Sequence, residues 1–213
     1  MYKRQAVTPA DAKQTAAAQA QLGSFGYSAT LPSATDAVTE IKNEVLSLKI
    51  SNKGGYIVDA TVLGFEQFEK NSKKAVQIIK DKNASLDITL NTADNRTLHT
   101  KDMFFEPKLT TEGKNQVLTL QLKAGPDQFL EYRYVLKPND YMLDFAIRSQ
   151  GLEKVVNTSK PLDLEWQLKT YRNEKSISYE NRYTELVFEY EDGKDDYLNA
   201  ASDSEDEAID VSY

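Results

Sequence analysis

An apolar residue at every second position, in run after run from Val38 onward, is the feature that most constrains the fold of this chain. Side chains on a strand point alternately to opposite faces, so each run presents one apolar face. The pattern covers 46–50, 58–62, 86–90, 118–122, 130–136, 141–147, 162–168 and 186–190. It therefore predicts a chain built mainly of β-strands, each buried on one side.

Short turn sequences separate these runs and indicate how the strands connect. Gly125-Pro126 and Pro138-Asn139 are such breaks, because Gly, Pro and Asn are the residues that turns select. The segment 137–140 joins two alternating runs at hairpin distance. Eight or more half-buried strands with short turns predict an all-β fold of two antiparallel sheets packed face to face, larger than an immunoglobulin domain. One short helix is expected within 171–181.

The pair Gly54-Gly55 lies between two of the runs and admits two interpretations. A phosphate-binding loop needs glycines between a strand and a helix N-terminus. Here a second strand-like run follows, and neither a Gly-Lys-Ser/Thr sequence nor a third glycine is present. The glycines are therefore predicted to form a structural turn.

Composition divides the chain into unequal parts. Residues 1–35 are rich in Ala, Gln and small residues, and we expect a tether that is flexible or weakly helical. Residues 36–213 are expected to form the β domain. The net charge is −7, yet residues 185–213 contain 11 acidic residues and one lysine, so the remaining residues carry +3. The segment 203–210 is acidic, but it lacks the glycine and trailing glutamate of a calcium loop, and we interpret it as a solvated connector.

Several classes of protein and site are excluded or disfavoured. The negative charge argues against a nucleic-acid-binding protein, and the lack of cysteine excludes disulfides and thiolate metal sites. No apolar run reaches the roughly 18 residues that a membrane helix needs. The N-terminal residues lack the apolar stretch of an intact signal peptide. We expect neither a cofactor nor a metal.

Candidate catalytic residues are few. His99 is the only histidine, so a nucleophilic triad built on it is conceivable, but a surface position is the favoured interpretation. Glu44 with Asp59, and Asp163 with Glu165, are carboxylate pairs that glycoside hydrolysis could use. A solvated sheet face explains them more simply, and no catalytic residue is predicted.

Aromatic residues form a stripe along the hairpin on either side of 137–140, at Phe129, Tyr132, Tyr134, Tyr141 and Phe145. They could line a ligand cleft, for which Tyr132, Tyr134 and Tyr141 are the candidates. Buried cross-strand pairs are the alternative, and they are the more common use of such residues.

The stretch KNEVLSLKISNKGGYIVDATVLGF resembles the opening strand pair of the periplasmic domain of YidC-type membrane-protein insertases. That family carries an N-x-x-L-x-x-x-I-x-x-x-G-G pattern, here Asn43, Leu46, Ile50, Gly54 and Gly55. The stretch YRYVLKPNDYMLDFAI is similar to the family's Tyr-x-x-x-Lys-x-x-x-Tyr hairpin. The tryptophan-containing strand and the acidic tail follow in the order of the Bacteroidetes-type insertases, so the resemblance covers about residues 36–213.

The resemblance implies a two-sheet antiparallel β-supersandwich, similar to galactose mutarotase-like enzymes, with short helical pieces. It implies a non-enzymatic accessory domain on the periplasmic side of the bacterial inner membrane, joined to a membrane-embedded insertase. Its implied partners are Sec translocon accessory subunits and nascent membrane proteins. On this basis Lys137, Asn139 and Asp140 are expected near a partner surface.

The alternative on the same fold is a mutarotase-like sugar epimerase or a carbohydrate-binding module, because fold alone does not decide function. Mutarotation needs a general acid and a general base on opposite sides of the sugar. The sugar enzymes of this fold use more than one histidine, and this chain has one. A non-catalytic sugar binder stays open and requires exposed aromatic residues.

Overall fold

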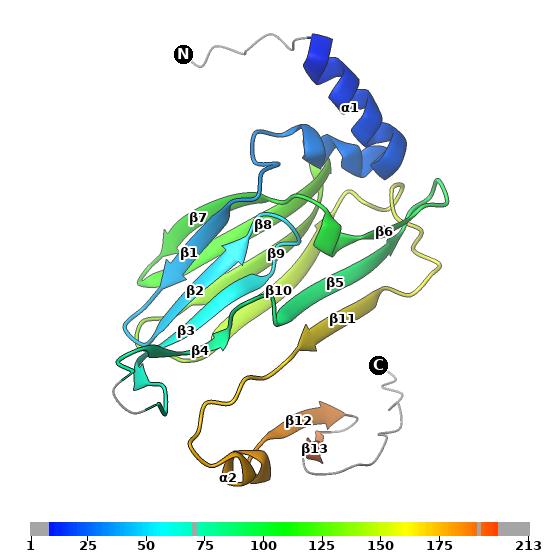
Figure 1. Cartoon of the computed structure of the whole chain (residues 1–213). Helices are drawn as coiled ribbons and strands as arrows, with labels where there is room; N and C mark the ends of the chain where they lie inside the picture. Colours follow the sequence, from blue (N-terminus) through cyan, green and yellow to red (C-terminus); the bar gives the residue numbers. More distant parts are fainter. Residues whose placement is uncertain (1–8, 70–71, 191–192, 200–213) are drawn as a thin grey trace. The chain divides into compact units, whose positions relative to one another are not determined.

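The computed structural model describes residues 9–69, 72–190 and 193–199 (Figure 1). The acidic segment 203–210, considered above for calcium, lies outside these residues. In chain order the elements are α1 (Pro9–Leu22), η1 (Gly23–Thr30), β1 (Val38–Lys42), β2 (Leu46–Ser51), β3 (Ile57–Glu66), β4 (Ala75–Ile79), β5 (Ala84–Asn91), β6 (Thr97–His99), η2 (Thr100–Asp102), β7 (Glu106–Glu112), β8 (Asn115–Gly125), β9 (Gln128–Leu136), β10 (Leu143–Gln150), β11 (Asp163–Leu168), α2 (Ile177–Arg182), β12 (Glu185–Tyr190) and β13 (Lys194–Asn199).

Two compact units divide the chain, and each is described by itself. The larger unit comprises Met1–Phe65 and Gln77–Thr170, and the smaller one comprises Glu66–Val76 and Tyr171–Tyr213. The described residues form sheets in the strand orders β1-β2-β3-β4, β10-β9-β8-β7, β11-β5-β6 and β12-β13, and every described ladder is antiparallel. The prediction of a mostly β chain with antiparallel sheets and short helices is confirmed.

The core of the larger unit joins the apolar faces that the alternation predicts. Leu118, Leu120 and Leu122 of β8 are fully buried, and Tyr132 of β9 is buried beside them. They belong to one cluster with Ile41 of β1 and with residues of β2 and β5. Three sheets of this unit therefore share a single apolar core, which the period-two pattern builds one strand face at a time.

The turn between β2 and β3 is held against this core. Gly54 and Gly55 have φ of +80° and +69°, a backbone conformation that L side chains rarely adopt. A Cβ on Gly55 would lie 2.9 Å from Cδ2 of Tyr132, so the position also lacks room for a side chain. The hydroxyl of Tyr134 donates a 2.7 Å hydrogen bond to the carbonyl oxygen of Gly55. The glycines let the chain turn close to the β9 aromatic residues.

Within the segment expected to be a tether, η1 packs on the β-sheets. Phe25 is fully buried and belongs to the core cluster. The hydroxyl of Ser28 donates to the carbonyl oxygen of Phe104 at 2.6 Å and accepts from the Lys123 N–H at 3.2 Å. The apolar residues that surround Phe25 come from distant strands, so its local sequence gave no sign of this packing. The domain boundary at residue 35 stays a prediction.

The smaller unit contains a two-stranded ribbon and one short helix. β12 pairs with β13 in register from Glu185↔Asn199 to Tyr190↔Lys194. The hydroxyl of Ser176 accepts a hydrogen bond from the Tyr179 N–H and caps α2, which agrees with the short helix expected within 171–181. Across the described part of the chain, no helix is long and apolar enough to cross a membrane.

Replacing Phe25 by Ala tests the packing of η1. We expect the free energy of unfolding to fall by about 3–5 kcal/mol, because the change leaves a cavity in a closely packed core. Urea unfolding followed by circular dichroism measures this loss. The control is Ser24→Ala, at an exposed position of the same turn, which should change stability by no more than about 0.5 kcal/mol. Equal small effects of both changes would contradict the packing.

Candidate functional site

An open apolar cleft in the larger unit is the candidate functional site. Its volume is about 510 Å³. Phe145 and Trp166 line it and stay 39% and 64% exposed, although large apolar side chains of this kind are usually covered. The other lining residues are Tyr56, Ile57, Ile79, Ala84, Ser85, Leu86, Tyr134, Leu143 and Leu164.

The cleft exists because two sheets each end in a strand whose apolar face is incompletely covered. β10 is the edge strand beside β9, and β11 is the edge strand beside β5 (Figure 1). Phe145 lies opposite the buried Tyr134, and Leu164 lies opposite the buried Ile88. Cross-strand partners point to the same face, so Phe145 and Leu164 lie on core-side faces while remaining open to solvent.

Stacked aromatic rings join the cleft to the core. The ring of Phe145 lies 4.7 Å from that of Tyr134 and 5.6 Å from that of Tyr132, and Tyr132 lies 4.8 Å from Phe105. Burial raises the pKa of Tyr132 to about 12 and raises the pKa of Tyr134 further. Both hydroxyls therefore remain protonated at neutral pH and serve as hydrogen-bond donors, which fixes this wall of the cleft.

The structure separates the three aromatic residues proposed for the cleft. Tyr134 lines it, Tyr132 is fully buried beneath it, and Tyr141 is 52% exposed and is not among the lining residues. Sequence reasoning missed Leu143, Leu164 and Trp166 as lining residues. Their alternation was visible, but it predicts an apolar face without saying whether another element covers that face.

The turn at 137–140 is tied to the segment that precedes β2. The side-chain amide of Asn43 donates to the carbonyl oxygens of Lys137 and Asp140, each at 2.7 Å. Glu44 accepts a 2.7 Å hydrogen bond from the Asn139 N–H. Asn43 also accepts from the backbone N–H groups that begin β2. Asn43, which begins the first sequence pattern of the insertase resemblance, therefore contacts the hairpin turn of the second pattern and stabilises it.

The side chain of Lys137 faces Asp144 across the hairpin. Its Nζ lies 2.9 Å from the carboxylate of Asp144, which raises the pKa of Lys137. Asn139 has φ of +51°, as a turn asparagine can. The three residues expected near a partner surface thus form one turn, whose structure is set by contacts within the chain.

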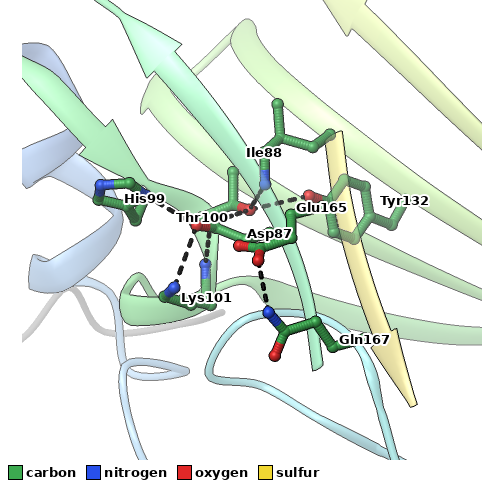
Figure 2. Close-up of polar contacts among 8 residues, drawn as sticks. All are labelled: Asp87, Ile88, His99, Thr100, Lys101, Tyr132, Glu165 and Gln167. Carbon is green, nitrogen blue, oxygen red and sulfur yellow. Dashed lines mark hydrogen bonds and ion pairs between the residues drawn. The ribbon is translucent and has the colours of Figure 1, made fainter. Parts of the chain in front are cut away.

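His99 belongs to a polar network around the buried Asp87 (Figure 2). Its Nδ1 lies 2.7 Å from Asp87 Oδ2, and the Lys101 Nζ lies 3.4 Å from the same oxygen. Thr100 bridges the network to the core, because its hydroxyl contacts Asp87 and the Tyr132 hydroxyl at 3.3 and 3.2 Å. Asp87 is 3% exposed, so these partners are what allow a carboxylate to be buried here.

This network sets the ionisation of Asp87. Burial alone would raise the pKa of its carboxyl group. The Lys101 N–H, the His99 hydrogen bond and the positive charges on the Lys101 and His99 side chains together outweigh burial and lower that pKa. Asp87 is therefore ionised at neutral pH, and its interactions join β5 to β6 and η2.

The carboxylate pairs considered for hydrolysis have other neighbours. Asp59 contacts Lys49 at 3.7 Å, and Glu44 holds the Asn139 turn. Asp163 and Glu165 are exposed on β11, where Glu165 lies opposite Asp87. No cluster of His, Cys, Asp and Glu able to hold a metal occurs among the residues that the structure describes.

Comparison with known proteins gives one consistent family. Residues 38–210 match the family model of the YidC periplasmic domain. A membrane protein insertase YidC of Parabacteroides distasonis is 32% identical over 168 residues, which cover 78% of this chain and 26% of that protein. The YidC insertase of Porphyromonas gingivalis strain W83 is 28% identical over 206 residues, covering 96% of this chain and 31% of that protein. No solved structure matches the chain.

The match covers only part of each relative. A YidC insertase of Bacteroides fragilis strain ATCC 25285 is 28% identical over 95% of this chain, and the chain covers 31% of that protein. The chain therefore spans less than a third of the length of these curated relatives.

Replacing Asp87 by Asn tests the buried network through pH. A carboxyl group whose folded pKa is lowered contributes stability that is present above its unfolded pKa, about 3.9. That stability is lost as the pH falls through the folded pKa. At pH 7 we expect Asp87→Asn to lower the free energy of unfolding by about 1–3 kcal/mol, because buried donors lose a charged acceptor. The loss should shrink below about pH 4.

Urea unfolding at pH 7 and at pH 3 measures how much Asp87→Asn lowers the free energy of unfolding at each pH. Asp163→Asn is the control, because Asp163 is exposed, and it should change stability little at either pH. A loss for Asp87→Asn that is the same at both pH values would show that its charge is unimportant.

Proposed function

The chain belongs to the family of YidC periplasmic domains, and from this premise we propose that it serves a membrane-protein insertase as an accessory domain. The domain is non-catalytic. In the proposed role it contacts Sec translocon accessory subunits and holds segments of nascent inner-membrane proteins. The insertase that carries it is a multi-pass protein of the inner membrane, with this domain on the periplasmic side.

The open apolar cleft is the observation that carries the proposal. Its walls are the core-side faces of two edge strands, and Leu143, Leu164 and Trp166 present apolar groups along it. A membrane protein entering the bilayer exposes apolar segments that need temporary cover, and an apolar cleft supplies this without sequence-specific contacts. The cleft therefore fits a polypeptide client.

The same lining disfavours the carbohydrate alternative. Trp166 is exposed enough to stack on a sugar ring, but sugar hydroxyls also need several polar partners. Three lining residues carry a hydroxyl group, Tyr56, Ser85 and Tyr134, and the hydroxyl of Tyr134 already donates to Gly55. Two hydroxyl groups replace only part of the hydrogen bonds to water that a sugar would lose here.

Three further parts of the proposal follow the family resemblance. The sheets of the larger unit form a β-supersandwich of the galactose mutarotase type. Residues 1–35 connect the domain to a membrane segment of the insertase. The turn at Lys137, Asn139 and Asp140 lies near the partner surface. Asn43 fixes this turn by two hydrogen bonds. This supports the proposed partner surface, because a preformed surface loses less conformational entropy on binding.

Peptide binding to the chain tests the proposal, and Trp166 is its reporter. It is the only tryptophan and lines the cleft, so its fluorescence should shift to shorter wavelength when a peptide covers it. The probe is an extended peptide with apolar residues at alternate positions. We expect Phe145→Ser to weaken binding about tenfold, or about 1.4 kcal/mol, because it removes apolar contact area.

Leu109→Ser is the matched control, because Leu109 is 50% exposed on β7, the opposite edge strand of the same sheet. It should leave binding unchanged. Equal affinities for the wild-type chain and Phe145→Ser would contradict a role for the cleft. A fluorescence shift produced by oligosaccharides and not by peptides would favour the carbohydrate alternative.

A further inference from the structure

Among the residues that the structure describes, β11 pairs with β5 alone and lies at the end of its sheet, so one of its edges has no neighbouring strand there. The Lys169 N–H donates to the carbonyl oxygen of Asn83, so at residue 169 the main chain points toward β5. Main-chain groups alternate in direction along an antiparallel strand. Those of Leu164, Trp166 and Leu168 therefore point to the open edge.

The sequence of β11 and the residue after it is self-complementary about Trp166. It reads Asp-Leu-Glu-Trp-Gln-Leu-Lys from 163 to 169. When this segment runs antiparallel to a copy of itself with Trp166 opposite Trp166, Asp163 faces Lys169. Leu164 then faces Leu168, and Glu165 faces Gln167. Every facing pair is either apolar or free of like charge, which is the condition for stable cross-strand pairing.

We propose that β11 pairs with β11 of a second copy of this chain, in an antiparallel register centred on Trp166. The two copies are related by a two-fold axis, so the interface is formed by the same residues on both. The facing residues Leu164, Trp166 and Leu168 supply the main-chain hydrogen bonds, since their groups point to the open edge. The inference goes beyond the proposed function and does not rest on it.

Charge and exposure favour a second copy as the occupant. Two ion pairs between Asp163 and Lys169 form symmetrically on the outer face. All residues from 161 to 170 are exposed, and an exposed edge strand bearing Trp166 is a template for pairing. On the inner face, the apolar side chains of one copy lie beside those of the other copy. These are the side chains of Leu164, Trp166 and Leu168. The apolar wall of each cleft is thereby extended across the axis.

Sedimentation equilibrium of the purified chain tests the pairing and its register together. We expect a reversible dimer of twice 24.0 kDa. Lys169→Asp places like charges in both facing pairs and should raise the dissociation constant about tenfold. Asp163→Lys combined with Lys169→Asp exchanges the charges, restores the facing pairs and should restore dimerisation. Both positions are exposed, so the fold is not expected to change.

Single cysteines give a second measurement, because the chain contains no cysteine. In a hydrogen-bonded antiparallel pair the facing Cα atoms are about 5.5 Å apart, within the range of a disulfide. Trp166→Cys should therefore form a covalent dimer on mild oxidation. Glu165→Cys is the matched control, because each copy of residue 165 faces residue 167. Its own counterpart then lies beyond the roughly 7 Å limit.

The results separate the alternatives. Dimerisation that Lys169→Asp weakens and the exchanged pair restores, with covalent linkage at 166 and not at 165, supports the pairing. A chain that stays monomeric at all concentrations overturns it. So does a dimer that neither charge change affects, or one that links at 165 as readily as at 166. Trp166 lies on the dimer axis and also reports peptide binding, so the fluorescence titration is run at chain concentrations below the dissociation constant of the dimer, where the signal measures the peptide alone.

Discussion

The contact between the aromatic residues of β9 and the turns opposite them is the interaction on which the larger unit depends. Tyr134 donates to the carbonyl oxygen of Gly55, and Tyr132 donates to Thr100 of η2. These two buried hydrogen bonds join β9 to the Gly55 turn and to η2, both far away in sequence, in a layer where a polar group without a partner would be costly. Because Gly55 has no side chain, its turn can approach the ring of Tyr132. Tyr134 also lines the cleft, so the same contact fixes part of the cleft wall.

The positions of the strands could be predicted from the sequence far better than the elements that pack against each strand. Alternation in β8, β9 and β11 located all three strands, because one face of each is apolar whatever it packs against. Leu120 of β8 is fully buried, whereas Trp166 of β11 is 64% exposed. The difference lies in which other element covers the strand, and local periodicity carries no information about that. Phe25 is the opposite case, because its segment looks like a linker while its side chain fills the core.

The candidate site could be predicted in part for the same reason. Tyr134 was proposed for the cleft and lines it, while Tyr141 lies elsewhere on the same hairpin. No sequence pattern indicated that Asp87 is buried, because its partners His99 and Lys101 come from elements that meet it only in the fold. Asn43 was visible as part of a family pattern. Its physical role is to hold the turn at 137–140 by two hydrogen bonds, and that role depends on residues that meet it only in the folded chain.

The family of the chain and its open cleft are consistent with one function. The family match identifies a non-catalytic periplasmic domain of an insertase. The structure adds an apolar cleft whose walls suit an extended polypeptide, and an open strand edge with a self-complementary sequence. These features support the proposed role, in which the domain offers apolar and main-chain surfaces to other polypeptides.

Site-specific photo-crosslinking in cells that produce the insertase carrying this domain shows whether newly made membrane proteins reach the cleft. A photoreactive residue at Ile147 would lie on the partly exposed core-side face of β10, the same face as the cleft-lining Phe145 two residues before it. One at Arg148 would lie on the opposite face of the same strand. We expect adducts with newly made inner-membrane proteins at position 147 and none at position 148. Equal labelling at both positions, or none at 147, would contradict it.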